Sequence, residues 1–523
     1  MWRKPQITFS LTQRMNYANV ALNNAIGMLD SNLAGEIGSA LNLHAIISEM
    51  DYITNQTKYK NEVTEFFSRY PHVSVFAQTL KINLTVVNKA MFGRAAIHAY
   101  MAYQDERFLN AASDAWDSVR QYALLRDDIE SNRSIDQNIH LSCYGESMAG
   151  GTFNEMEGPN FFGWETGLFF TLSGLLYEIS SNSTYMNAAV QSGDFIWKHL
   201  YRAPGLILEL IDARSCNSPT QDFKIHLSGF WIEGLSILLS SSGNSSVFPL
   251  LQQSIVAATN QIGISWQQDN GVQGNDEVPF RNGFLIRGLR TAYQRLNTSN
   301  SDLKNYIQLY LGVQYNALLD LATQNHSNMY AGKWSGPAPL NSDLLNQTAA
   351  SEVLIAGILI QSIQNSSTPT PKQPHSQPMM PPNRDTKQPI GAIVGGTVGG
   401  GIGLAGLFIT FFVMYHRHQQ KEPGLLSPFQ MGAEQDAVPD VDRKLLSGEA
   451  STSGIVPRSH MGDVSIEDMV GVVYDRINSE SRPRGDVSFD DLVRAVYDRI
   501  NLQGLQEAPP SYRPTQTAVH SAS

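Results

Sequence analysis

Asp127 and Asp128 are adjacent carboxylates, and two neighbouring acids can divide nucleophilic attack and proton transfer between them. No other adjacent aspartates occur before the long apolar segment near the C-terminal third of the chain. Their neighbours Arg126, Glu130 and Arg133 are also charged. We therefore expect a solvated surface run here rather than a catalytic pair.

A second group of acids lies beside glycines and a tryptophan. Glu155 and Glu157 follow the glycines at 150–151, and Glu165 directly follows Trp164. An indole ring can stack on the face of a sugar while a carboxylate binds its hydroxyls, so these residues are candidates for sugar binding. The same pattern is equally ordinary at a helix start, because acids favour helix N-termini.

The elements that must position these residues are predicted to be helices. Apolar residues recur at spacings of three and four, and no convincing run of alternating strand residues is present. The predicted helices cover residues 88–103, 107–124, 164–180, 184–200, 223–239 and 284–296.

The helices also repeat as hairpins. Tyr100 is followed by Phe108 and two alanines, and Tyr177 is followed at the same spacing by Tyr185 and two alanines. Stacked hairpins of this kind close into an α/α toroid or continue as a solenoid. Glycines and aromatic residues in the loops favour an all-α toroid with a ligand-binding end.

Several motifs in this region resemble glycoside hydrolase family 76, the fungal and bacterial α-1,6-mannanases. The residues that carry the resemblance are the loop 150–153 with the helix after it, Phe280 with Arg281, the Trp-Ser-Gly-Pro sequence that begins at Trp334, and the small-residue segment 347–351. The resemblance covers residues 16–364 and implies an (α/α)6 barrel that acts on mannan-type wall polysaccharide. It further implies a fungal, membrane-anchored member, in which Glu157, Trp164 and Trp334 are sugar-binding candidates, although Trp334 suits a structural role better.

The resemblance also identifies where catalysis is expected. Family members carry two adjacent aspartates at a helix start, and Val87 and Asn88 occupy that place here, followed by Met91 and Phe92 where the family has tryptophans. Valine has no polar atom, and asparagine is neither a nucleophile nor a proton donor near neutral pH. No catalytic residue is therefore assigned, and activity by the ordinary mechanism is doubtful.

Glu155 and Glu165 are the substitutes that could supply a carboxyl in place of the missing pair. Two hypotheses remain: a mannan-directed glycosidase, and a non-catalytic receptor or anchor that binds wall glycans.

The C-terminal third predicts a membrane anchor. Residues 390–415 contain no charged side chain and exceed the roughly 20 residues that cross a bilayer. The glycine spacing in this segment could bring two helices together, or it could be a glycine-rich helix with no partner. Residues 365–389 are rich in Pro, Ser and Thr and predict an extended stalk.

Cations and sequons predict the orientation of the chain. Cations follow the apolar segment directly, which favours a cytosolic C-terminus at the plasma membrane. N-glycosylation sequons all precede the segment, at Asn55, Asn83, Asn132, Asn182, Asn244, Asn297, Asn325, Asn346 and Asn365. Cys143 and Cys216 lie on the same side and form either a disulfide or two buried thiols. Residues 1–15 lack the apolar run of a signal peptide. Export of the N-terminal part requires such a signal or another route, and we favour the explanation that a first exon is missing from the sequence.

The predicted cytosolic tail, 416–523, contains a duplication. Residues 462–478 and 485–501 repeat one amphipathic pattern. This pattern predicts either two helices that dock into a partner protein or a pair of helices that pack against each other. A PPxY sequence from Pro509 to Tyr512 is of the type that WW domains bind.

Charge and spacing exclude other classes of function. The net charge is −11 and no cluster of Lys and Arg suggests nucleic-acid binding. No zinc-ligand spacing, phosphate loop or Ser/His/Asp arrangement is evident, so no metal and no cofactor are expected.

Overall fold

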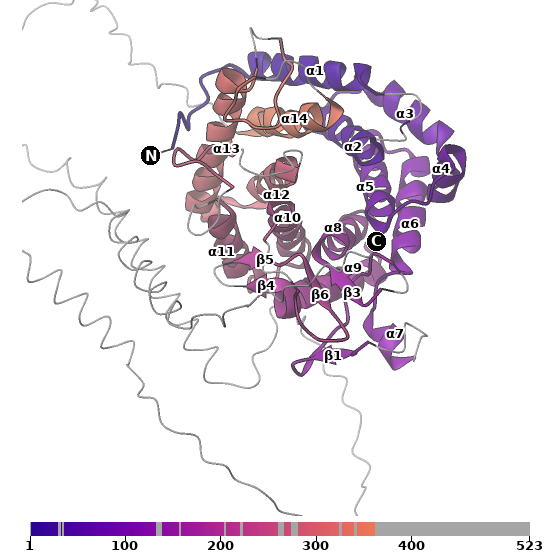
Figure 1. Ribbon diagram of the computed structural model, residues 1–523. Coiled ribbons are helices and arrows are strands. Elements are labelled where there is room, and N and C mark those ends of the chain that lie inside the picture. Colours follow the sequence, from indigo (N-terminus) through magenta and orange to yellow (C-terminus); the bar gives the residue numbers. More distant parts are fainter. Residues whose placement is uncertain are drawn as a thin grey trace, which may run out of the picture. The chain divides into compact units, whose positions relative to one another are not determined.

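The computed structural model describes residues 2–29, 33, 36–131, 139–155, 158–202, 205–219, 223–259, 266–273, 281–323, 327–338 and 343–360. All of them belong to one compact unit. Its helices form two concentric rings (Figure 1). The predicted stalk, apolar segment, duplication and PPxY sequence lie outside the described residues.

The inner ring is closed by helices that each contact the next. They are α2 (Ile37–Thr54), α5 (Val86–Tyr103), α8 (Gly163–Ser180), α10 (Ile225–Ser242), α12 (Asn282–Arg295) and α14 (Leu344–Leu359). The outer ring consists of α1 (Leu11–Gly27), α3 (Lys60–Arg69) with α4 (Val73–Leu80), α6 (Glu106–Arg120), α9 (Ser183–Phe195), α11 (Val247–Thr259) and α13 (Ser301–Leu321). Because inner and outer helices alternate along the chain, all inner helices run in the same direction. This is the predicted (α/α)6 arrangement.

We call the end of the inner ring where these helices begin the mouth. The longest connections lie at this end, between α6 and α8 and between α9 and α10. They hold α7 (Arg126–Glu130), the π-helix η1 (Ile196–Leu200) and the short strands β1 (Ser142–Cys143), β2 (Glu146–Ser147), β3 (Asn160–Phe162), β4 (Tyr201–Arg202), β5 (Leu206–Ile207) and β6 (Leu210–Asp212). A short 3-10 turn, η3 (Thr298–Asn300), precedes α13. The sequence predicted no strands, because segments of two or three residues are too short to show alternation.

Antiparallel pairing joins the two long connections at the mouth. Strand β3 pairs with β6, with Phe161 opposite Ile211, and β1 pairs with β2 in a hairpin. Cys143 and Cys216 form a disulfide with a Cα–Cα distance of 5.4 Å, so the first of the two predicted alternatives is the one observed. The disulfide ties the hairpin to the connection that follows β6.

Hydrogen-bonded caps fix several helix starts. Ser10 and Gln13 form a capping box at α1, and this helix begins within the segment 1–15 that the sequence analysis set apart from the barrel. Trp2 packs against Tyr306 at a ring distance of 5.1 Å and against Tyr310 at 5.6 Å. The segment 1–15 is therefore part of the folded unit, because its aromatic residue and the first turn of α1 pack with the outer ring.

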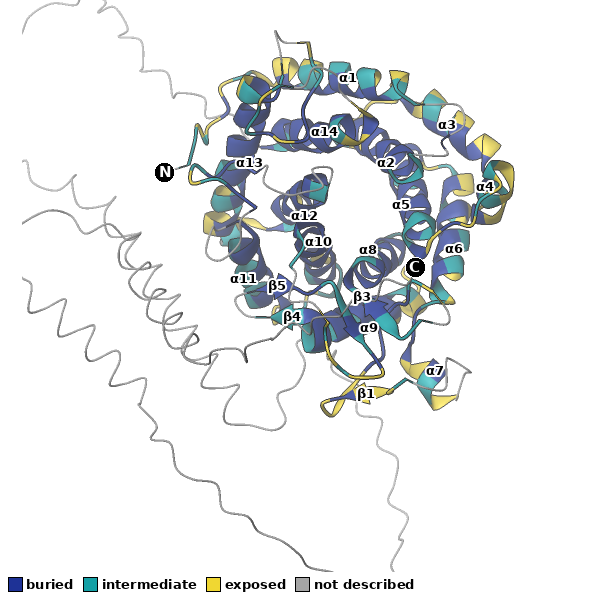
Figure 2. Cartoon of the chain, in the orientation of Figure 1, coloured by how far each residue is buried: buried dark blue, intermediate teal, exposed yellow. Residues whose placement is uncertain are grey.

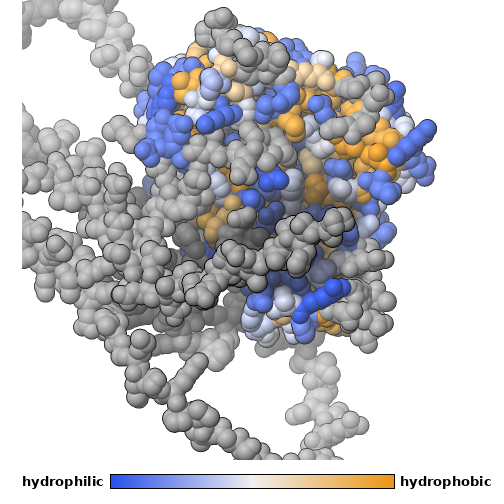
Figure 3. Space-filling view, viewed as in Figure 1, coloured by the Kyte–Doolittle hydropathy of each residue, from blue (hydrophilic) through white to orange (hydrophobic). Residues whose placement is uncertain are grey.

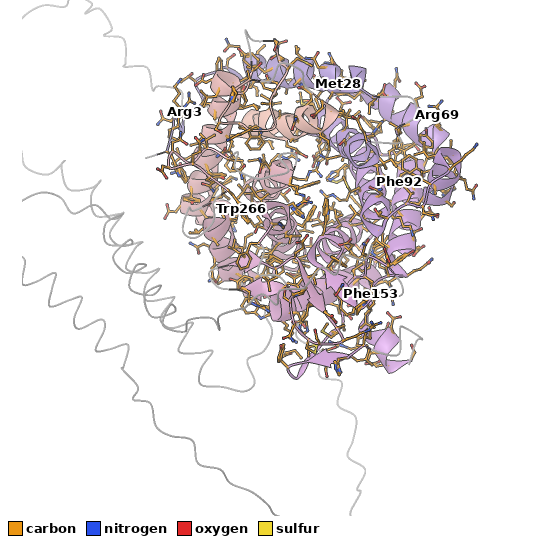
Figure 4. All side chains as sticks on the ribbon, in the orientation of Figure 1. Arg3, Met28, Arg69, Phe92, Phe153 and Trp266 are labelled. Carbon is orange, nitrogen blue, oxygen red and sulfur yellow. A yellow bond between two sulfur atoms is a disulfide. The ribbon has the colours of Figure 1, made fainter. Side chains whose placement is uncertain are left out.

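The residues of the inner and outer rings differ in how far they are buried (Figure 2). The inner helices are buried on almost every side, and exposed residues gather on the outer helices and around β1 and α7. Between the rings lies an aromatic layer around Phe92 of α5 (Figure 4). Phe92 meets Phe67 of α3 edge to face at 5.3 Å and lies 5.5 Å from Phe76 of α4 with the ring planes tilted by 35°. Figure 3 shows that polar and apolar residues are mixed over the face of the molecule in this view.

The interior of the inner ring is filled by charged side chains, which we call the axial charge network. Its members are Glu49, Arg94, His98, Glu233, Arg287, Arg290 and Glu352, and all are buried. Arg94 donates to Glu233 at 2.8 Å and to Thr171 at 2.8 Å. Since α5 and α10 are not neighbours in the ring, this ion pair spans its interior.

A second set of ion pairs crosses the ring beside the first. Arg290 pairs with Glu49 and, at 3.0 Å, with Glu352. Arg287 pairs with Glu352 and donates to Asn42 at 2.7 Å. Burial raises the pKa of Glu49, but the charges of Arg290, His98, Arg287 and Arg94 outweigh burial and hold this pKa below its usual range. When Thr171 of α8 is counted, each of the six inner helices contributes a residue to these contacts.

None of the described helices is long and apolar enough to cross a membrane. The predicted span, 390–415, lies outside the described residues.

Replacing Arg94 by methionine leaves Glu233 buried without its cation. Breaking a buried pair in this way costs about 3–5 kcal/mol, so we expect Arg94→Met to lower the free energy of unfolding by that amount in chemical denaturation. The double variant Arg94→Met, Glu233→Leu removes the unpaired charge and recovers most of the loss. Arg107→Met, at an exposed pair with Asp105, is the matched control and leaves stability nearly unchanged. Equal losses in the single and double variants would contradict this account.

Candidate functional site

The first turn of α5 reaches the mouth and carries Val87 and Asn88. The Thr85 side chain caps the helix by accepting from the Asn88 backbone N–H at 3.2 Å. Both Val87 and Asn88 are half-buried. A Cβ atom placed on Gly38 of α2 would lie 3.9 Å from Oδ1 of Asn88, so the asparagine amide points toward the start of α2.

Helix periodicity places Val87 above the axial charge network. At about 100° per residue, Val87, Met91, Arg94 and His98 share one face of α5. Arg94 and His98 belong to the network, so Val87 shares the face of α5 that lines the ring interior. Phe92, the other residue at a tryptophan position of the family, instead packs in the aromatic layer between the rings.

A small pocket opens beside Asn88. It encloses about 210 Å³ of empty space, open solvent included, and is lined by Gly38, Ser39, Asn42, Met91, Phe284, Leu345, Thr348 and Ala349. The space within it that a water molecule can occupy is about 10 Å³, roughly room for one water. A glycan would therefore lie over the mouth, with at most a single group entering the pocket.

The charge network forms the floor of the ring below this pocket. Arg94, Thr171, Glu233, Arg290 and Glu352 each lie eight residues after the first residue of their helix. At a rise of about 1.5 Å per residue, this places them about 12 Å below the mouth. Asn42 connects the pocket lining to this floor through its bond with Arg287.

An aromatic and cationic cluster occupies the other side of the mouth. Trp164 of α8 lies 4.5 Å from the His226 ring of α10 and 6.4 Å from the Phe284 ring of α12. The Arg281 guanidinium lies 5.3 Å from the centre of the Trp164 ring. Phe284 also lines the pocket, so the cluster and the pocket are continuous.

Three polar atoms in this cluster have no hydrogen-bond partner among the residues that the structure describes. Trp164 Nε1, His226 Nδ1 and Arg281 Nε are buried and make no hydrogen bond. Buried polar atoms are almost always paired, so these three atoms are free to bond a ligand or water at the mouth. Trp164 was predicted from the sequence as a sugar-binding candidate, and Arg281 was recognised as part of a motif. His226 was not predicted, because its only signal in the sequence is a polar residue at the start of a predicted apolar helix.

Glu165 is buried and lies on a different face of α8. It lies seven residues before Leu172, and this spacing puts both on one side of the helix; Leu172 packs at Gly93 of α5. Glu165 therefore faces the first turn of α5, where Val87 stands. Burial, with a smaller contribution from the charge of Glu209, raises the pKa of Glu165 to about 7. Within the described part of the chain, Glu165 Oε2 has no hydrogen-bond partner.

The remaining residues that the sequence analysis proposed do not contact the pocket or the Trp164 cluster among the described contacts. Glu155 is exposed, and Glu157 lies outside the described residues. Trp334 is fully buried, as its structural role required. Asp128 is buried as well, because it pairs with Arg120 at 2.8 Å and caps α7 by accepting from the Leu125 N–H at 2.8 Å. The predicted surface run is therefore wrong for Asp128, whereas Arg126, Asp127 and Glu130 are exposed as predicted.

The sequons that the structure describes lie at the surface. Asn55, Asn83, Asn182 and Asn297 are exposed, and Asn244 and Asn346 are half-buried. Asn132, Asn325 and Asn365 lie outside the described residues. Within the described ranges no group of three His, Cys, Asp or Glu side chains is placed to hold a metal ion.

Several solved structures with a similar fold are family 76 glycoside hydrolases. The chain resembles an α-1,6-mannanase of this family from Salegentibacter sp. with a TM-score of 0.55 and 13% identity, over 66% of this chain and 100% of that one. It resembles a family 76 mannosidase from Bacteroides thetaiotaomicron with a TM-score of 0.50 and 12% identity, over 66% of this chain and 98% of that one. No family model and no curated protein matches the chain in sequence.

Inactive variants of the Salegentibacter enzyme have also been solved with bound oligosaccharides. One of them has two aspartates replaced by asparagine and was solved in complex with α-1,6-mannotriose; the chain resembles it with a TM-score of 0.55 and 14% identity, over 66% of this chain and 100% of that one. A second inactive variant, with alanines in the same two places, was solved with α-1,6-mannotetrose.

The raised pKa of Glu165 predicts a pH-dependent stability. Between its ordinary value near 4.3 and about 7, the folded state binds the proton more tightly than the unfolded state, so stability falls as pH rises through this range. We expect Glu165→Gln to be more stable than the wild type by about 3 kcal/mol at pH 8 and equal to it near pH 4. Denaturation across this range measures the difference, with exposed Glu155→Gln as the control. Parallel pH profiles for the wild type and Glu165→Gln would contradict the assignment.

Proposed function

We propose that this chain binds α-1,6-linked mannose glycans at the mouth of its barrel and does not hydrolyse them by a two-aspartate mechanism. The observation that carries the proposal is the first turn of α5, where Val87 and Asn88 stand at the mouth above the ring interior. Retaining hydrolysis requires two carboxyl groups about 5–5.5 Å apart. A valine and an asparagine supply neither.

Binding does not require the missing acids. The Salegentibacter variants that lack both aspartates were solved with α-1,6-mannotriose and α-1,6-mannotetrose. Asn88 offers an amide beside the pocket, and Trp164 offers an indole across it. An amide that binds hydroxyls and a ring that packs on a sugar face are the groups that a glycan-binding cleft needs.

Hydrolysis through another acid is the second candidate function. Glu165 favours it, because a carboxyl with a pKa of about 7 can donate a proton at neutral pH, and it faces the start of α5. Glu209 is close enough to influence its charge and is the second carboxyl available to such a mechanism. The two functions differ in whether the wild-type chain releases sugar.

The remaining parts of the chain support a cell-surface setting for this activity. We propose a fungal protein anchored in the plasma membrane by residues 390–415, with the barrel outside and the stalk 365–389 between them. N-glycosylation at the sequons and docking of a cytosolic partner, including a WW-domain protein at Pro509 to Tyr512, belong to the same proposal. The pairing of a glycan-binding barrel with a tail of duplicated segments suits a wall-facing receptor or anchor.

Titration calorimetry of the full chain with α-1,6-mannotriose tests the proposed function. We expect binding without product in a parallel chromatographic assay, and about tenfold weaker binding in Asn88→Ala or Trp164→Ala. Tyr52→Ala is the matched control, because Tyr52 is an exposed aromatic residue near the C-terminal end of α2, far from the mouth. Val87→Asp combined with Asn88→Asp is expected to introduce hydrolysis.

Two outcomes would contradict the proposal. If the wild type releases mannose and Glu165→Gln abolishes the release, the chain is an enzyme with a relocated acid. If Tyr52→Ala weakens binding as much as Trp164→Ala does, the mouth is not the binding site.

A further inference from the structure

The starts of α10 and α12 differ from those of the other inner helices in charge. Helices α5 and α14 are capped by the side chains of Thr85 and Asp343, and α8 carries Glu165 in its first turn. In contrast, the N-cap residues of α10 and α12 are Lys224 and Arg281, and neither makes a side-chain cap. Neither helix has an acid in its first turn.

A cation at a helix N-terminus is unfavourable, because the helix dipole already places positive charge there. The positive ends of two neighbouring inner helices and the Arg281 guanidinium over Trp164 thus lie at one side of the mouth, together with backbone N–H groups that have no intrahelical acceptor. This arrangement suits an anion. We call this group of Lys224, His226 and Arg281 the α10–α12 corner.

His226 gives an independent indication of a ligand at the corner. It is 1% exposed, lies in the first turn of α10, and has no partner at Nδ1. It lies seven residues before Glu233, so both side chains are on the face of α10 that lines the ring interior. Burial, reinforced by the charges of Arg281 and Lys224, holds the pKa of His226 well below its usual value. The buried imidazole is therefore neutral and can donate or accept one hydrogen bond to an occupant.

Close packing fixes the corner in place. A Cβ on Gly229 would lie 2.4 Å from the backbone oxygen of Phe284, and one on Gly288 would lie 2.3 Å from that of Gly229. Helices α10 and α12 therefore touch backbone to backbone just below their first turns. The two N-termini and the Arg281 side chain, which lies over Trp164, are held beside one another.

We propose that the α10–α12 corner binds a phosphate ester carried by the mannose-type glycan. This proposal rests on the proposed function and adds one feature of the ligand, a phosphate group. Arg281 supplies a fork of donors suited to phosphate oxygens, His226 Nδ1–H donates one hydrogen bond, and the N–H groups of α10 and α12 complete the coordination. Trp164 beside them holds the sugar ring. The only first-turn acid on the neighbouring helix α8, Glu165, is directed away from the corner toward α5.

The test compares a phosphorylated ligand with its neutral parent. Calorimetry of the full chain would use α-1,6-mannobiose, the same disaccharide with a phosphate monoester, and inorganic phosphate. We expect the phosphorylated disaccharide to bind at least about tenfold more tightly than the neutral one, and this advantage to shrink as salt is raised. Arg281→Gln should abolish the advantage, so that the ratio of the two affinities falls to about one whatever the variant does to the affinity for the neutral disaccharide.

Two further variants keep the test independent of any local folding defect. Lys224→Gln should reduce the advantage in part, and Arg107→Gln, the same charge change on exposed Arg107 near the start of outer helix α6, should leave it intact. Thermal unfolding verifies that each variant is folded.

The possible results separate this inference from the proposed function. Equal affinity for the neutral and phosphorylated disaccharides would overturn the phosphate site and leave glycan binding standing. Inorganic phosphate binding as tightly as the phosphorylated disaccharide, with no binding of the neutral one, would support an anion site and overturn glycan binding. An advantage that survives Arg281→Gln, or no binding of any probe, would overturn the inference.

Discussion

The axial charge network is the interaction on which the rest of the barrel depends. Three arginines and three glutamates, with His98 beside them, are buried where the six inner helices converge. Each charge would be costly to bury alone, so every inner helix must keep its register for the pairs to form. The network therefore restricts the ring to one arrangement, in addition to the apolar packing between the rings.

That restriction sets the geometry of the mouth. Network residues lie eight positions after the start of five inner helices, so the first turns of these helices meet at one level. Val87 and Asn88, Trp164 and His226 come from three helices that are distant in sequence, yet they surround one opening. The charge network holds the floor of this opening and does not depend on carboxyls at positions 87 and 88, which agrees with the proposed glycan binding without hydrolysis.

Part of this structure was accessible from the sequence and part was not. The repeated hairpins predicted the toroid, and helix starts near residues 88, 164 and 284 were within two positions of those observed. Helices such as α2 and α14 are buried on nearly all sides, so they carry no clear amphipathic pattern and their bounds could not be read from periodicity. The network was hidden for the same reason: Glu233 within α10 gave only a lone charge in an apolar run, and its partner Arg94 lies far away in sequence. The α10–α12 corner likewise depends on packing between separate helices, which no local pattern describes.

The central claim is that the mouth is the glycan-binding end of a barrel that has lost its paired acids. A crystal structure of the protein with α-1,6-mannotriose tests this claim most directly. The account predicts an intact trisaccharide between Asn88 and Trp164, over the pocket lined by Phe284 and Met91, with a sugar ring packed against the indole. A trisaccharide bound at the opposite end of the barrel, or a cleaved product at the mouth, would contradict it.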